Sequence, residues 1–223
     1  SDWTELDMRQ RRIVQMLAHR IFANRTELMD GMSFMQRLDR SPIMREEIGE
    51  LAECLDQRSD LDPIPCPGIP EEWPLVLHGA YERDEILTAA GWMNETRRPS
   101  MREGTLALAP HKIELLFVTL DKKEGFHERV AYHDYAISPE LFHWQSQNSA
   151  SPMTNAGKRY LESPGNGWSF QLFVRESRDH SYIALGPLAL EGEPTGSKPM
   201  SITWQLHVPI PMAMFRRFTV LRT

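Results

Sequence analysis

The sequence contains only two cysteines, Cys54 and Cys66, which lie twelve positions apart and outside any CxxC pair. No histidines stand near them at zinc-finger spacing, so both a disulfide scaffold and a zinc finger are excluded. The chain also lacks a secretory signal and any apolar run near the ~18 residues that would span a bilayer. We therefore expect a soluble protein in a reduced, cytoplasmic setting. Because the sequence begins at Ser-Asp-Trp without Met, we expect an excised fragment.

Catalytic signatures are missing as well. No GxxxxGK[ST], GxGxxG, HExxH or GxSxG motif occurs in the chain, so the usual signs of nucleotide-phosphate binding, metalloprotease and hydrolase chemistry are absent. The nearest approach to a catalytic set is His133, Asp134 and His143 beside a serine, without a nucleophile elbow or a metal set. We expect a chain that is not an enzyme, needs no cofactor and binds no metal.

The net charge of -6 is unevenly distributed. Residues 1–75 carry fifteen acids and nine arginines, whereas residues 76–223 carry sixteen groups of each sign. The acidity thus belongs to the first segment. A neutral second segment can still present a basic face, so charge neither supports nor excludes a nucleic-acid partner.

Helical spacing dominates the first segment. From Asp7 to about Asp56, apolar residues recur at intervals of three and four, as an amphipathic helix requires. Ser41-Pro42 has the form of a helix start. The expected buried stripe of that helix consists of Ile48, Leu51, Ala52 and Leu55. The pattern predicts a small helical unit whose apolar faces form an ordinary core.

The stretch from Asp62 to Pro70 holds four prolines and cannot continue a helix. It divides the chain into a helical coupling segment over 1–66, a Pro-rich linker over 67–75 and a second domain over 76–223. A short helix is expected near the start of that domain, from about Glu82 to Gly91.

The rest of the second domain has the pattern of strands. Ile202, Trp204, Leu206 and Val208 alternate cleanly with polar residues, which indicates a sheet with one buried face. The predicted fold is therefore α+β, a small helical segment followed by a mostly β curved sheet or barrel. The runs rich in β-branched and aromatic residues are 113–120, 129–137, 168–176, 181–190 and 200–208.

Two neighbouring segments, Tyr132-His-Asp-Tyr-Ala-Ile-Ser138 and Leu141-Phe-His-Trp-Gln-Ser-Gln-Asn-Ser149, crowd aromatic, carboxylate, amide and hydroxyl groups together. We expect the first on a strand and the second on the turn after it. Aromatic faces can hold a flat ring by stacking, while the polar groups read its edge. A nucleic-acid base is the candidate ligand.

The order of motifs from residue 77 to residue 211 resembles the C-terminal region of bacterial superfamily II helicase-like proteins, which commonly carry a phospholipase D type nuclease at the other end. The resemblance is carried by segments that include Leu77-His-Gly-Ala-Tyr81, Tyr132-His-Asp-Tyr-Ala-Ile-Ser138, Phe142-His-Trp-Gln-Ser-Gln147 and Pro199-Met-Ser-Ile-Thr-Trp204. The family includes modification-dependent restriction enzymes, whose last domain resembles the SET and RING associated (SRA) fold. The resemblance implies an SRA-like, PUA-like second domain.

SRA domains flip 5-methylcytosine out of DNA and sandwich it between two tyrosines. The resemblance places Tyr132 and Asp134 at the first wall of such a pocket, and Phe142, Trp144, Gln145 and Ser146 at the second. Trp, Gln and Ser replace a Tyr, a Thr and a Gly of the SRA pattern. Lys158-Arg159 lies where several SRA domains have a loop that reaches into DNA.

These residues lead to a hypothesis for the pocket. Tyr132 and Trp144 would hold opposite faces of an extruded cytosine, while Asp134 accepts a hydrogen bond from its exocyclic amine. Gln145 and Ser146 would reach the remaining edge, and Phe142 could form a slot for the methyl group. Tyr135 alternates to the opposite face and is the weaker pocket candidate. The residues expected to contact the DNA backbone are Lys122, Lys123, Lys158 and Arg159.

The resulting expectation is a DNA-recognition module that detects 5-methylcytosine or 5-hydroxymethylcytosine, with helicase and nuclease domains of the same parent chain as partners. Cleavage and ATP hydrolysis would reside in those domains. Two alternatives stay open: a structural or protein-interaction domain that couples helicase and nuclease parts, and an RNA-binding or modified-nucleotide-binding domain of a related barrel fold. Burial of the ring residues in a core would favour the first of these alternatives.

Overall fold

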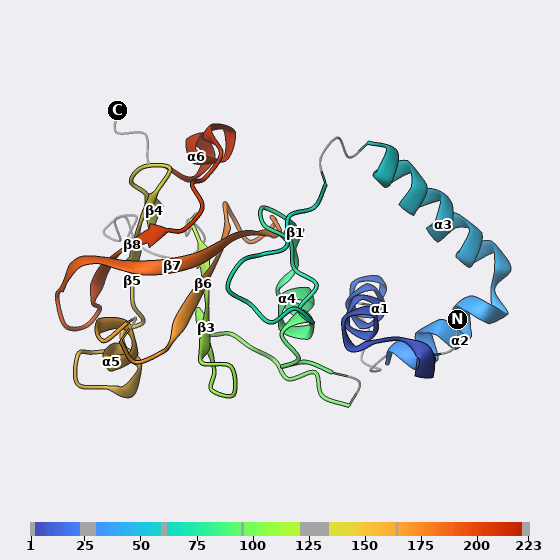
Figure 1. Ribbon diagram of the computed structural model, residues 1–223, viewed down its shortest axis with the longest axis horizontal. Helices are drawn as coiled ribbons and strands as arrows, with labels where there is room; N and C mark the ends of the chain where they lie inside the picture. Colours follow the sequence, from blue (N-terminus) through green and yellow to red (C-terminus); the bar gives the residue numbers. More distant parts are fainter. Residues whose placement is uncertain are drawn as a thin grey trace. The chain divides into compact units, whose positions relative to one another are not determined.

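The computed structural model describes residues 3–22, 30–58, 62–94, 96–120, 134–163 and 165–219 (Figure 1). The chain forms two compact units. The first contains residues 1–65, 69–77 and 81–101, and the second contains residues 66–68, 78–80 and 102–223. Residues 69–75 of the predicted linker belong to the helical unit.

The first unit is helical, and local signals fix where its helices begin. A 3-10 turn, Trp3–Glu5, precedes α1, Met8–Ile21. Asp7 accepts the Gln10 N–H at 2.8 Å while the Gln10 side chain accepts the Asp7 N–H at 3.0 Å, which makes a capping box. The helices that follow are α2, Gly31–Arg40, α3, Pro42–Gln57, and α4, Arg83–Ala89.

The apolar core of this unit is small. Phe22 and Phe34 meet edge to face with ring centroids 6.2 Å apart, and Ala18 is buried beside them. The prediction of a buried stripe on α3 was wrong, because no described residue of that helix is buried and Leu51 and Leu55 are 59% and 58% exposed. Helical spacing shows that a face is apolar, but a neighbouring element must be present to cover it.

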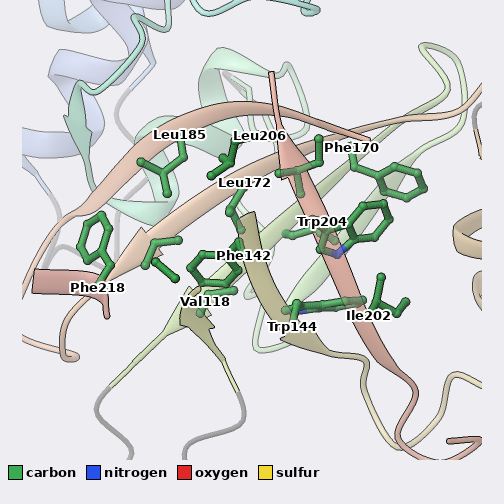
Figure 2. Packing of buried hydrophobic residues seen from close by; sticks show 14 of the residues in the cluster. Val118, Phe142, Trp144, Phe170, Leu172, Leu185, Ile202, Trp204, Leu206 and Phe218 are labelled. Atoms are coloured by element: carbon green, nitrogen blue, oxygen red, sulfur yellow. The ribbon is translucent and has the colours of Figure 1, made fainter. Parts of the chain in front are cut away.

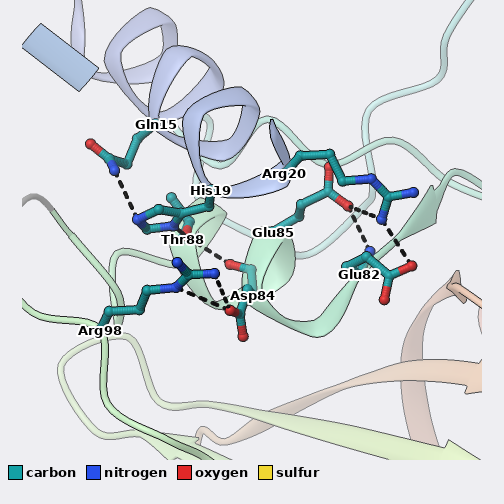
Figure 3. A network of polar contacts seen from close by, with 8 residues as sticks. All are labelled: Gln15, His19, Arg20, Glu82, Asp84, Glu85, Thr88 and Arg98. Carbon is teal, nitrogen blue, oxygen red and sulfur yellow. Dashed lines mark hydrogen bonds and ion pairs between the residues drawn. The ribbon is translucent and has the colours of Figure 1, made fainter. Parts of the chain in front are cut away.

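A chain of neutral hydrogen bonds joins α1 to α4 (Figure 3). The Gln15 amide donates to His19 Nε2 at 2.8 Å, which requires the proton of the ring to be on Nδ1. His19 Nδ1 then donates to the Thr88 hydroxyl at 2.8 Å, and Thr88 donates to the Asp84 carbonyl at 2.7 Å. The arrangement is satisfied only by a neutral imidazole, and burial lowers the pKa of His19 to about 4.

The second unit is built on a mixed sheet, in agreement with the predicted α+β fold. The strand order is β2-β3-β6-β7-β8-β5-β4, with β1 paired to β7. Strands β3 and β6 are parallel, while the other pairs along this order are antiparallel. The described strands form an open sheet and not a barrel.

The strands agree with four of the five predicted runs, and the fifth falls largely on residues outside the described ones. Three strands were missed: β1, β2, and β5, which was expected as a turn. The bounds are β1, Ala80–Tyr81; β2, Thr105–Leu108; β3, Ile113–Thr119; β4, Tyr135–Ala136; β5, Leu141–Gln145; β6, Ser169–Arg175; β7, Tyr182–Thr195; and β8, Ser201–Leu206. Helices α5, Asn155–Leu161, and α6, Met212–Phe218, complete the unit.

Alternate residues of these strands form the core of the second unit (Figure 2). Ile202, Trp204 and Leu206 are buried, as the alternation predicted, whereas Val208 lies beyond the end of β8. Four rings pack at the centre with centroids 4.9 to 6.4 Å apart, and this set is Trp144, Tyr160, Phe170 and Trp204.

No helix among the described residues is long and apolar enough to cross a membrane.

Candidate functional site

The predicted pocket residues divide between the core and the edge of the sheet. Trp144 is 3% exposed and Phe142 is fully buried. Both side chains point into the aromatic core (Figure 2). Trp144 contacts Tyr160 edge to face, with centroids 5.3 Å apart. In this structure neither ring therefore offers an exposed face on which a base could stack.

Asp134 and Ser146 hold the backbone around β5. Asp134 Oδ1 accepts the Gln145 N–H at 2.8 Å, so this carboxylate orients the end of the strand. Ser146 Oγ accepts the Met200 N–H at 2.9 Å and donates to the Gln147 carbonyl at 3.2 Å. The two side chains were predicted to contact a base, and in this structure they link β5 to its neighbouring segments.

Tyr132, Lys122 and Lys123 lie outside the described residues.

Lys158 and Arg159 belong to helix α5 and not to a loop. Lys158 is exposed. Arg159 Nε donates to Glu114 Oε2 at 2.8 Å, and the Tyr160 hydroxyl donates to the other oxygen of the same carboxylate at 2.8 Å. The Arg159 guanidinium also lies 4.9 Å from the centroid of Trp168. Arg159 is thus engaged by a buried carboxylate, which makes it a poor candidate for a phosphate contact.

Burial of the phenol, with Glu114 beside it, raises the pKa of Tyr160, so the phenol keeps its proton and remains a donor.

The opposite face of strands β4, β5, β8 and β7 carries a different set of side chains. Cross-strand pairing places Tyr135, His143, Thr203 and Glu191 in one row. Tyr135 and His143 stack with centroids 5.0 Å apart and an interplanar angle of 21°. Each of these two residues is partly exposed. We call the four residues, with Gln145 and Ser201, the polar aromatic face.

Hydrogen bonding fixes the imidazole of this face. His143 Nε2 lies 2.6 Å from the Ser201 hydroxyl of β8. The next row pairs Gln145 with Ser201, so an amide and a hydroxyl border the ring pair. A half-exposed ring stack with amide and hydroxyl groups beside it can hold a planar polar ligand and read its edge.

The sequence contained the signal for this face in the alternation of β5. Phe142 and Trp144 face the core, while His143 and Gln145 face outward. The prediction treated residues 141–149 as a turn, and a turn gives no such alternation. Tyr135 was expected to be the weaker pocket candidate, but its ring stacks on His143 and both residues are partly exposed.

A cavity of about 370 Å³ lies in the helical unit. Its polar groups pair with one another: Arg20 lies 2.9 Å from Glu82, and Arg98 lies 2.8 Å from Asp84 (Figure 3). These ion pairs hold α4 in place, and none of the four paired side chains is left to bind a ligand. Among the described residues, no group of three or more His, Cys, Asp or Glu side chains could hold a metal ion.

A family model described as "Domain of unknown function (DUF3427)" matches residues 75–218. The match includes α4, the strands of the sheet and both helices of the second unit. No curated protein matches the chain.

Proposed function

The chain belongs to the DUF3427 family through residues 75–218, and from that premise we propose that it is a non-catalytic DNA-recognition module that binds modified cytosine by base flipping. The proposed ligand is 5-methylcytosine or 5-hydroxymethylcytosine in duplex DNA, and the proposed setting is the cytoplasm. Helicase and nuclease activities would belong to other domains of a parent restriction enzyme. The resemblance of residues 77–211 to helicase-associated C-terminal regions covers nearly the same span as the family match.

The observation that carries the proposal is the stacked pair of Tyr135 and His143 on the polar aromatic face. A base laid against this pair would extend an existing stack. One base-aromatic contact contributes ~1 to 3 kcal/mol, and extrusion of a base costs a few kcal/mol. One contact therefore offsets only part of the cost, and hydrogen bonds to the base edge must supply the remainder.

Edge recognition is available beside the ring pair. Gln145 can both donate and accept, and Ser201 and Thr203 add hydroxyl groups on the neighbouring strand. A base with the wrong edge would leave such groups unpaired, at ~1 to 3 kcal/mol for each buried group. The methyl group contributes less, about 0.8 kcal/mol or a factor of about four.

The proposed ligand is the one expected from the sequence, but the residues proposed to stack on it are different. The ring that stacks on the base becomes Tyr135 or His143, because Trp144 and Phe142 fill the core. Tyr132 keeps its expected role as a second wall, and Lys122 and Lys123 keep theirs at the DNA backbone. Lys158 stays a candidate for a phosphate contact because it is exposed.

The test is a binding titration with three duplexes that differ only in cytosine, 5-methylcytosine or 5-hydroxymethylcytosine at one position. Tyr135→Ala is expected to weaken binding of the modified duplexes by roughly 5- to 150-fold, as the loss of one stacking contact predicts. Gln205→Ala is the matched control, since Gln205 is exposed in the adjacent row of the same face and has no ring.

The proposal is supported if at least one modified duplex binds more tightly than the unmodified duplex, and if this difference is lost in Tyr135→Ala and kept in Gln205→Ala. Equal affinity for all three duplexes, unaffected by Tyr135→Ala, refutes it. Circular dichroism of each variant checks that the sheet is retained.

The second candidate function is a protein-interaction domain that couples helicase and nuclease parts. Burial of Trp144 in the core favours it, as do the exposed apolar residues of α3, because such a helix gains stability when a partner covers it.

A further inference from the structure

Helix α3 carries an apolar seam that is only partly covered by the described residues. Met44, Ile48, Leu51 and Leu55 recur at spacings of four, three and four, which is the pattern of a helix that packs along another helix. Leu51 and Leu55 are more than half exposed, and Ile43 beside the seam is 72% exposed. Helices in proteins gain most of their stability from packing of an apolar face, so the exposed part of the seam is suited to a partner.

The first half of the seam already forms one wall of a groove. Met44 and Ile48 pack partly against the Phe22 and Phe34 cluster. A groove of about 480 Å³ runs between Ile21 of α1 and the α3 residues from Ile43 to Leu51, with Glu47 on its lining. Beyond the groove, the seam continues to Leu55. The apolar surface is therefore elongated, which suits a helix better than a compact ligand.

The charge of α3 restricts the occupant. Five carboxylates lie on this helix against one cation, Arg45, which itself lies 3.9 Å from Asp39. Within the described part of the chain, no ion pair joins any of the five, which are Glu46, Glu47, Glu50, Glu53 and Asp56. At about 100° per residue, Glu47 flanks the seam and lines the groove, whereas Glu46 and Glu53 lie on the opposite side of the helix. A second copy of α3 would carry the same net negative charge and be repelled, whereas a basic helix would be attracted by the net charge and lie against Glu47.

We propose that α3 and the groove beside it form a docking site for a basic amphipathic helix of a partner protein. The apolar side of the partner helix covers Leu51 and Leu55, and its lysines or arginines lie near Glu47. The site belongs to the helical unit and is independent of base recognition by the sheet.

The test uses two synthetic peptides of 21 residues with the same leucine seam, one flanked by lysine and arginine and the other by glutamate. Fluorescence anisotropy measures their binding to the full chain. The basic peptide is expected to bind at least tenfold more tightly than the acidic one, and its binding is expected to weaken as salt is raised.

Leu51→Gln with Leu55→Gln is expected to weaken binding of the basic peptide at least tenfold. Glutamine is a good helix former, and both leucines are exposed, so the helix content should be retained. The matched control is Met153→Gln, which removes another exposed apolar side chain from the second unit.

A charge variant tests complementarity separately. Glu47→Lys with Glu50→Lys is expected to reduce the preference for the basic peptide. Equal binding of both peptides, or binding that the leucine variant leaves unchanged, would overturn the proposal. So would a concentration-dependent dimer in sedimentation that the leucine variant abolishes, because the occupant would then be a second copy.

Discussion

Replacing Arg159 with alanine tests whether this residue holds the core or contacts DNA. In the native protein its guanidinium and the Tyr160 hydroxyl occupy the two oxygens of Glu114, each at 2.8 Å. The Glu114 side chain is 1% exposed and that of Arg159 is 21% exposed. Arg159→Ala therefore leaves a buried carboxylate with one hydrogen bond and no cation.

The expected loss follows from the charges. Two unit charges about 4 Å apart interact by about 4 kcal/mol at an effective dielectric constant of 20. The contact with Trp168 adds ~0.5 to 1 kcal/mol, and water can replace part of the interaction because Arg159 is partly exposed. We expect Arg159→Ala to lower the free energy of unfolding by about 3 to 5 kcal/mol, the range for breaking a buried pair.

Guanidinium unfolding followed by circular dichroism, with linear extrapolation to water, measures this loss. Lys158→Ala is the matched control, because this exposed neighbour should change the free energy by less than about 0.5 kcal/mol. A double variant, Glu114→Gln with Arg159→Met, removes both charges and should recover most of the stability.

An Arg159→Ala variant within about 1 kcal/mol of Lys158→Ala would refute the reasoning. Reduced DNA affinity without reduced stability would instead assign Arg159 to a phosphate contact.

Two further predictions concern pH and packing. Because the folded pKa of His19 is about 4, below the ordinary 6.5, the unfolded chain takes up the proton first as pH falls. The contribution of His19 to the free energy of unfolding should be complete above about pH 6.5 and decrease by up to about 3 kcal/mol towards pH 4. When the free energy of unfolding is measured across this range, it should change less steeply with pH in His19→Gln. The exposed control, His180→Gln, should keep the pH dependence of the native protein. Gly157→Ala should lower the melting temperature by several degrees, because the added Cβ would overlap the Ser151 carbonyl; Gly49→Ala, where a Cβ meets nothing within 4 Å, should not lower it.

Strands rich in apolar residues were predictable from the sequence. The runs that contain β3, β6, β7 and β8 were found because each is rich in β-branched, aromatic or other apolar residues, and their bounds agree within a few residues except at the end of β7. Strand β7 continues to Thr195 through Gly192 and Pro194, residues that normally end a strand. The short helix expected near Glu82 was also confirmed, as α4.

The strand β5 was missed because its sequence is ambiguous. His143 and Gln145 have no strong preference for strands, and the long-range pairing with β8 that orders them cannot be read from local pattern. The same limit applied to α3, whose spacing predicted burial although no described residue of that helix is buried.

The polar aromatic face lies within the segment that the sequence analysis selected, but the contacts of its side chains were not predicted. The cluster around residues 132–149 was noticed for its composition, but the stacking of Tyr135 on His143 depends on the register of β4 against β5. The role of Arg159 depends on Glu114, which lies 45 positions away in the chain. Neither partnership leaves a signal in the neighbouring residues.

The topology of the sheet also fixes when the polar aromatic face can form. Tyr135 and His143 lie on β4 and β5, but Thr203 and Ser201 lie on β8, which comes later in the chain. The sheet that holds these strands also contains the parallel pair of β3 and β6, whose members are far apart in the sequence. Non-local pairings of this kind are slow to form. A nascent chain that ends before β8 therefore contains both rings without the strand that supports them. The face becomes complete only when β8 is in place, so binding at this face would report that the chain through β8 has been made and that β8 has paired with β5.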